Sequence, residues 1–212
     1  MNYIFDFDGT LADSEQCSIL ATQKAFEQCD LHIPDEAQIK YYMGIPIEKS
    51  FVEMASRTLS VEEFDQLLVV FRAAYKEFET ATLTLFPNIS HVLQQLQSNN
   101  HHCFVLSSKK TEVLKRNLEA LQISHYFKDA FGSDRVQNYK PDSDGIFAIQ
   151  QAYDFAAIDT MMIGDAIFDL QMGKAANVKT CAVTWGSHSV EQLSAENPDF
   201  IIDEALQLLA II

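Results

Sequence analysis

Basic residues are scarce in this chain. Its 212 residues contain 15 Lys and Arg against 30 Asp and Glu, which gives a formal net charge of −15 at pH 7. Nucleic acids and anionic membranes bind basic surfaces, so this balance argues against both as partners. The same charge would repel a phosphorylated substrate, and a site for one would therefore need cations of its own.

Long apolar runs and paired cysteines are also missing. No stretch approaches the roughly 18 to 20 apolar residues that span a membrane, and no basic N-terminal segment with a cleavage site is present, so we expect a cytoplasmic protein. The cysteines are Cys17, Cys29, Cys103 and Cys181. Because none belongs to a Cys-x-x-Cys pair, we expect free thiols rather than disulfides or a zinc site.

Apolar residues form 48% of the chain, enough for a substantial core. Helical spacing predicts helices near 15–30, 35–43, 47–56 and 60–80, with no strand pattern among them. Later strands are predicted at 102–106, 130–132, 161–164, 180–183 and 200–202, alternating with helices at 89–97, 111–121, 142–153, 167–176, 191–195 and 204–209. We therefore predict an α/β fold with a doubly wound parallel sheet (1–14 and 83–212) and an inserted all-helical cap domain (15–82), joined by hinges at 12–15 and 81–88.

Two aspartates follow the first predicted strand, in the run Tyr-Ile-Phe-Asp-Phe-Asp-Gly-Thr-Leu-Ala-Asp-Ser over residues 3–14. Side chains alternate along a strand, so Asp6 and Asp8 point to the same side. Two carboxylates this close repel one another unless a proton or a divalent cation lies between them, and such ligands suit Mg2+. Gly9 allows a sharp turn that brings backbone N–H groups toward an anion. One Asp can then act as a nucleophile and the other as a general acid and base.

Further polar residues lie near the ends of later strands. Ser107 follows the strand 102–106, where we expect it to open a helix whose N–H groups bind an anion. Lys140, before a proline, can supply the cation that a phosphate site needs. Asp165 directly follows the strand 161–164. Asp169 lies one helical turn later on the same face, so both can reach one metal. Ligands of such sheets bind at the carboxyl ends of the strands, where strand order reverses.

These segments resemble the four motifs of the haloacid dehalogenase superfamily, whose members are mostly phosphatases. Residues 6–14 match the pattern Asp-x-Asp-Gly-Thr-Leu-x-Asp-Ser, and residues 164–169 match Gly-Asp-x-x-x-Asp, at every fixed position. The second motif often continues with Asn and Lys, and Ser108 stands at the Asn position. The third motif is similar to the segment around Lys140.

The resemblance implies a Mg2+-dependent phosphatase for small phosphorylated metabolites. Asp6 would attack phosphorus and form an aspartyl-phosphate, while Asp8 would act as general acid and base. The implied metal ligands are Asp6, Asp8 through its backbone carbonyl, Asp165 and Asp169. The implied phosphate-binding residues are Gly9, Ser107, Ser108 and Lys140.

Two segments, 42–51 in the predicted cap and 85–89 just after it, resemble phosphoglycolate phosphatase-like members of the superfamily. Candidate cations for an anionic substrate group are Lys49, Arg57, Arg72 and Lys76. The sequence leaves open phosphoglycolate, pyrophosphate, sugar phosphates and nucleoside monophosphates as substrates. It also leaves open whether the protein is a monomer or a homodimer.

Other functions fit parts of the pattern. A β-phosphoglucomutase-like phosphotransferase and a pyrophosphatase share the motifs, and an inactive phosphate-binding or regulatory relative is a non-enzyme alternative. Dehalogenases of the superfamily lack the second aspartate, whereas Asp8 is present. Receiver domains have no use for a helical insertion of this size.

Overall fold

A six-stranded parallel sheet positions the site in the computed structural model, which describes residues 1–211. Its strands are β1 (Asn2–Phe5), β4 (His102–Leu106), β5 (Phe127–Phe131), β6 (Thr160–Gly164), β7 (Lys179–Val183) and β8 (Phe200–Ile202). They are ordered β5-β4-β1-β6-β7-β8, so strand order reverses beside β1. The predicted α/β fold with a doubly wound sheet is confirmed.

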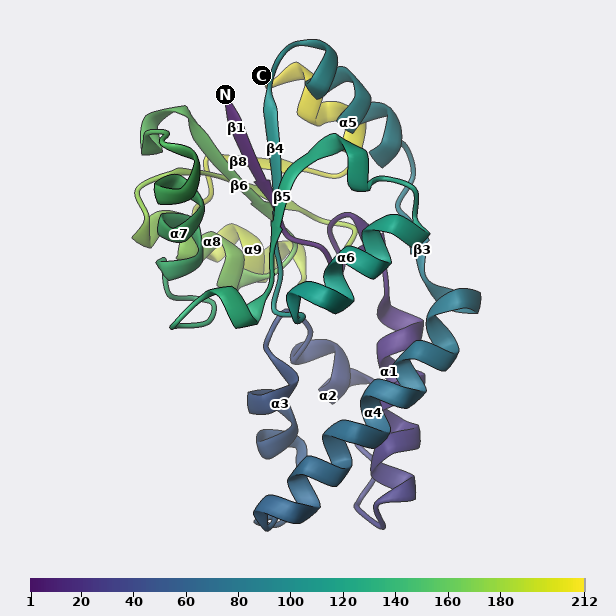
Figure 1. The fold of residues 1–212 in the computed structure, drawn as a ribbon. Helices are drawn as coiled ribbons and strands as arrows, with labels where there is room; N and C mark the ends of the chain where they lie inside the picture. Colours follow the sequence, from purple (N-terminus) through teal and green to yellow (C-terminus); the bar gives the residue numbers. More distant parts are fainter. Residues whose placement is uncertain (212) are drawn as a thin grey trace.

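Strand β1 is buried on both faces. Tyr3 and Phe5 face a cluster that includes side chains of α5 (Ile89–Ser98) and α6 (Thr111–Ala120). Ile4 faces the opposite cluster, with side chains of α7 (Asp144–Tyr153) and α8 (Ile167–Ala175). Figure 1 shows these two helical layers on either side of the sheet. Burial on both faces explains why residues 3–5 of β1 are apolar without alternation.

The helices α1 (Glu15–Gln28), α2 (Glu36–Tyr41), α3 (Ile47–Met54) and α4 (Val61–Thr82) lie beyond the carboxyl ends of the strands (Figure 1). They enclose an apolar cluster of their own, in which the rings of Phe51 and Phe71 meet edge to face at 5.0 Å. Ser60 and Glu63 form a reciprocal capping box at the start of α4. This separate core supports our proposal that residues 15–82 form a cap domain, and we use the word cap for them below.

A short antiparallel ladder joins the cap to the sheet domain. Strand β2 (Ala12–Asp13) pairs with β3 (Thr84–Leu85) within the two segments that we predicted as hinges. No strand was predicted there, because a two-residue strand is too short to show alternation. The two chain crossings are thus hydrogen-bonded to each other.

Most predicted elements agree with the structure to within three residues. The predicted helix 204–209 is instead a 3-10 helix, Ala205–Ala210. Helix α9 spans Val190–Ala195, close to the predicted 191–195. Among the described residues, no helix is long and apolar enough to cross a membrane. The cysteines of the described chain are free thiols, as predicted, and Cys17, Cys103 and Cys181 are buried.

Candidate active site

Three aspartates converge at the carboxyl end of the sheet. Asp6 follows β1, Asp165 follows the neighbouring β6, and Asp169 lies in the first turn of α8. One carboxylate oxygen of each lies within 4.8 Å of the others, and none of the three residues is more than 2% exposed. Helix α8 begins at Ile167, so Asp165 precedes the helix rather than opening it, but it still reaches the same cluster.

Lys140 completes this cluster from the loop before α7. Its ammonium nitrogen lies 2.5 Å from Asp6 Oδ1 and 2.7 Å from Asp169 Oδ1, and the residue is buried. Burial lowers the pKa of Lys140, but the two carboxylates raise it more, so that it lies above its ordinary value. Lys140 therefore stays positively charged beside Asp6. A phosphate site in so acidic a chain needs such a cation.

Lys140 alone does not balance the three carboxylates of the cluster. Burial raises the pKa of the Asp6 carboxyl to about 7; Lys140 opposes this rise, and Asp169 adds to it. Burial, and then the Asp6 charge, raises the pKa of Asp165 to about 6. The Oδ2 atom of Asp6 is buried and has no hydrogen-bond partner among the described residues. Three carboxylates with one lysine and an unpaired buried oxygen fit a Mg2+ ion, which prefers such oxygen ligands.

Asp165 is held tightly from two sides. The Thr10 hydroxyl donates to its Oδ1 at 2.8 Å, and the Ser187 backbone N–H donates to its Oδ2 at 2.7 Å. Gly9 has a φ of +78°, and a Cβ built there would lie 2.2 Å from Asp165 Oδ2. Gly9 therefore permits the turn and the close approach of the backbone to Asp165. Thr10 belongs to the matched first motif, but its role could not be predicted without Asp165 in place.

The side chain of Asp8 lies outside the metal cluster. Both its carboxylate oxygens accept from the Lys109 ammonium, at 2.6 and 2.8 Å, and Oδ1 also accepts from the Ser14 hydroxyl at 2.5 Å. Ser14 directly precedes α1, but its side chain makes no capping bond to that helix. Lys109 was not among the predicted site residues, although the second motif of the superfamily often ends in lysine.

The loop after β4 separates Ser107 from the next helix. Helix α6 begins at Thr111, as predicted, so Ser107 does not itself open it, and the Thr111 N–H donates to Asp134 Oδ1 at 2.6 Å. This N–H is therefore already paired, and the start of α6 does not supply the anion site that we expected. Ser107 is buried and its oxygen accepts from the Lys109 N–H. The Ser108 hydroxyl donates to the Gly44 carbonyl of the cap at 2.6 Å.

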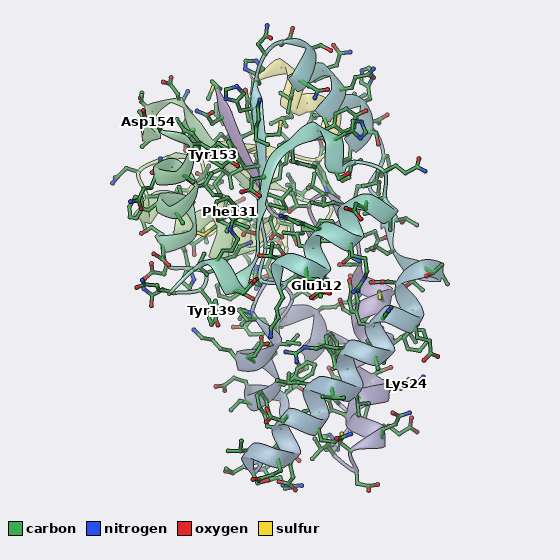
Figure 2. All side chains as sticks on the ribbon, in the orientation of Figure 1. Lys24, Glu112, Phe131, Tyr139, Tyr153 and Asp154 are labelled. Carbon is green, nitrogen blue, oxygen red and sulfur yellow. The ribbon has the colours of Figure 1, made fainter. Side chains whose placement is uncertain are left out.

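A cavity of about 460 Å³ lies between the cap and the sheet domain, with Asp6, Asp8 and Ser107 among its lining residues. Of the predicted cap cations, Arg72 and Lys76 line it. Arg57 instead pairs with Glu63, and Lys49 lies 5.1 Å from the ring centre of Tyr139. Figure 2 labels Tyr139 at the end of the sheet domain that faces the cap.

Known proteins are similar in sequence to this chain along most of its length. A family model described as "Haloacid dehalogenase-like hydrolase" matches residues 3–183. A "Probable phosphatase IndB" of Dickeya dadantii is 31% identical, over 94% of this chain and 88% of that protein. A "Phosphoglycolate phosphatase" of Vibrio cholerae is 27% identical over 98% of this chain and 95% of that protein.

Solved structures share the fold. A haloacid dehalogenase-like family hydrolase from Streptococcus pneumoniae has a TM-score of 0.87 and 28% identity, covering 99% of this chain and 97% of that one. The predicted likeness to the superfamily and to its phosphoglycolate phosphatase-like members is thereby confirmed. The motifs, the sheet order and these relatives together show that the chain belongs to the haloacid dehalogenase-like hydrolase family and is a phosphatase.

Proposed function

We propose that the protein is a Mg2+-dependent phosphatase that hydrolyses small phosphate monoesters through an aspartyl-phosphate on Asp6. The observation that carries the proposal is the pairing of a buried Asp6 with the Lys140 ammonium at 2.5 Å, on the wall of a cavity. A carboxylate held against a cation in a closed site is oriented for attack on phosphorus.

Two steps account for the reaction. Asp6 forms a bond to phosphorus as the bond to the ester oxygen breaks, and Asp8 gives its proton to the leaving oxygen. Asp8 then takes a proton from a water molecule, whose oxygen displaces Asp6 from phosphorus and releases phosphate. One side chain serves as acid and then as base, so each step restores the protonation state that the next one needs.

Charge on the phosphoryl oxygens needs donors close by. Lys140 stands beside the nucleophile, and the Ser107 hydroxyl lines the cavity without donating to any described residue. Ser108 would contribute its backbone N–H group, because its hydroxyl is already bonded to Gly44. The Gly9 N–H, which we expected to bind phosphate, instead donates to the Ala12 carbonyl at 2.9 Å. Lys140, Ser107 and Ser108 would bind the phosphoryl group.

The side chains of Asp6, Asp165 and Asp169, with the backbone carbonyl of Asp8, would hold the metal. A bound Mg2+ would offset the charge of the carboxylates and of the phosphate. The cap of residues 15–82 would exclude water and select the substrate.

A pyrophosphatase is the second candidate. It is favoured by a "Pyrophosphatase PpaX" of Oceanobacillus iheyensis, 26% identical over 99% of this chain and 95% of that protein. Inorganic pyrophosphate can occupy the same phosphate and metal sites, so the two candidates differ only in what the cavity accepts as leaving group.

Phosphate release from a panel of small esters and pyrophosphate, with Mg2+ or with EDTA, tests the proposal. We expect release only with Mg2+, and none from Asp6→Asn, whose shape is nearly unchanged but whose amide is not a nucleophile. A hexose phosphate that is isomerised without phosphate release would indicate a phosphotransferase instead. Undiminished turnover by Asp6→Asn would refute the assigned nucleophile.

A further inference from the structure

The cavity next to Asp6 is larger than a small anionic ester requires. Its volume of about 460 Å³ lies within the roughly 300 to 1,000 Å³ of pockets that enclose drug-sized ligands. Phosphoglycolate and pyrophosphate are each little larger than two phosphate groups. Resting on the proposed function, we propose that the substrate is a phosphate monoester whose alcohol part carries an apolar group about the size of an aromatic ring, bound against the cap.

The wall opposite the catalytic aspartates is mostly apolar. Its apolar residues come from α2, α3, α4 and the loop between α2 and α3, and they are Ile39, Tyr42, Met43, Ile45, Ile47, Phe51, Met54 and Phe71. Covering such a wall with apolar ligand surface contributes about 25 cal/mol per Å². A strongly hydrated leaving group would gain little from it.

Two of these residues line the cavity without being part of a described hydrophobic core. Met43 and Ile45 belong to none of the described apolar clusters, yet Met43 is only 8% exposed. Both stand on the loop whose Gly44 carbonyl accepts from Ser108 of the sheet domain. The contact fixes this loop to the loop after β4, and with it the two apolar side chains that line the cavity.

Aromatic rings extend the apolar wall. The rings of Phe51 and Phe71 meet at 5.0 Å, and those of Phe71 and Tyr75 at 5.8 Å. A ligand ring can join such a cluster edge to face, which adds to its area burial.

The cations along the cavity do not favour a second anionic group. Arg72 pairs with Glu48 at 2.8 Å, Arg116 with Glu79 at 2.8 Å, and Lys109 with Asp8. The other lining cations, Lys76 and Lys110, form no ion pair among the described residues, but both are exposed. A carboxylate buried against the cap would lack a buried cation to replace its water.

A matched pair of esters tests the proposal. Ethyl phosphate and 2-phenylethyl phosphate both release a primary alcohol, so their chemistry is similar and they differ mainly in the apolar group. We expect kcat/KM to be higher for the phenylethyl ester by about tenfold or more, since even one methylene in an apolar pocket can give that factor. Equal values, or a preference for ethyl phosphate or phosphoglycolate, would overturn the proposal.

Two variants test whether the preference for the phenylethyl ester arises in this cavity. Ile45→Asp places a charge in the cavity and is expected to lower the ratio of the two kcat/KM values toward one. Val52→Asp makes the same change on α3 at a side chain that is 57% exposed and outside the cavity, and should leave the ratio as in the wild type. If circular dichroism shows that Ile45→Asp is unfolded, Ile45→Ser serves in its place. A well-folded Ile45 variant with the wild-type ratio would contradict the proposal.

The results distinguish a wrong substrate class from a wrong proposed function. If ethyl phosphate and phosphoglycolate are hydrolysed with Mg2+ but the phenylethyl ester is no better, only the inferred substrate class is wrong. If no ester releases phosphate, the proposed function fails, and the inference fails with it.

Discussion

The Lys109 ammonium lies 2.6 and 2.8 Å from the two carboxylate oxygens of Asp8, and both side chains are 14% exposed. Burial lowers the pKa of Lys109, but its interactions with Asp8 and Tyr75 together raise the pKa more, so the lysine stays protonated. Its nitrogen also lies 4.5 Å from the ring centre of Tyr75 on α4. Lys109 thus connects the proposed general acid to the cap.

Removing this lysine should destabilise the protein. Lys109→Met leaves a largely buried carboxylate without its cation, and loss of one partner of such a pair typically costs about 3 kcal/mol. Urea unfolding would measure the loss in the free energy of unfolding. Adding Asp8→Asn to the variant should recover part of it, because the uncompensated charge is then gone.

The neighbouring Lys110 provides the control. It is exposed and forms no ion pair among the described residues. Lys110→Met should change the free energy of unfolding by no more than about 0.5 kcal/mol. Similar losses in the Lys109 and Lys110 variants would show that the contact with Asp8 does not stabilise the fold.

The sequence predicted the aspartate cluster because each motif stands near the end of a strand, and parallel strands bring those ends together. It did not predict Lys109, since a contact across 101 residues depends on where the loop after β4 runs. In that loop the Lys109 carbonyl accepts from the Ser133 N–H at 2.8 Å. Asp134 anchors the start of α6 by accepting from the Thr111 N–H; the sequence predicted a helix start at residue 111 but not this contact.

Stability should depend on pH through the carboxylate cluster. The pKa values of Asp6 and Asp165, about 7 and about 6, both lie above the ordinary 3.8, so the folded state binds their protons more tightly than the unfolded chain does. Their contribution to stability is complete below about pH 4 and is lost as pH rises through 6 to 7. The metal-free protein should therefore lose this contribution between pH 5 and 8.

Magnesium should reverse that loss, since it binds the deprotonated carboxylates. We expect Mg2+ to raise the melting temperature more at pH 8 than at pH 5.5, relative to EDTA. Calorimetric titrations near pH 6.5 in buffers of different ionisation enthalpy should show proton release on binding. An equal rise at both pH values, without proton release, would contradict the assignment of the cluster as a metal site.

Gly9 should matter for the metal beyond its backbone conformation. In Gly9→Ala the added Cβ would lie 2.2 Å from Asp165 Oδ2, so Asp165 must move, and Mg2+ affinity should fall by about tenfold or more. Gly44 is a matched control: its φ is +88°, but a Cβ there would lie 3.5 Å from Ala166 Cβ, an ordinary contact. Gly44→Ala should therefore carry similar backbone strain and keep Mg2+ affinity. Equal losses in both would assign the effect to strain alone.

The bond from the Ser108 hydroxyl to the Gly44 carbonyl, at 2.6 Å, joins the sheet domain to the cap loop that carries Met43 and Ile45. Ser108→Ala removes it, so amide hydrogen exchange over residues 42–46 should accelerate, while Ser108→Thr, which keeps a hydroxyl, should exchange as the wild type does. Unchanged exchange in the Ala variant would show that this bond does not hold the loop. Both variants retain the Ser108 N–H that we assign to phosphate binding. A fall in kcat/KM for 2-phenylethyl phosphate in Ser108→Ala alone, with ethyl phosphate less affected, would therefore report the position of the loop and not a lost phosphate contact.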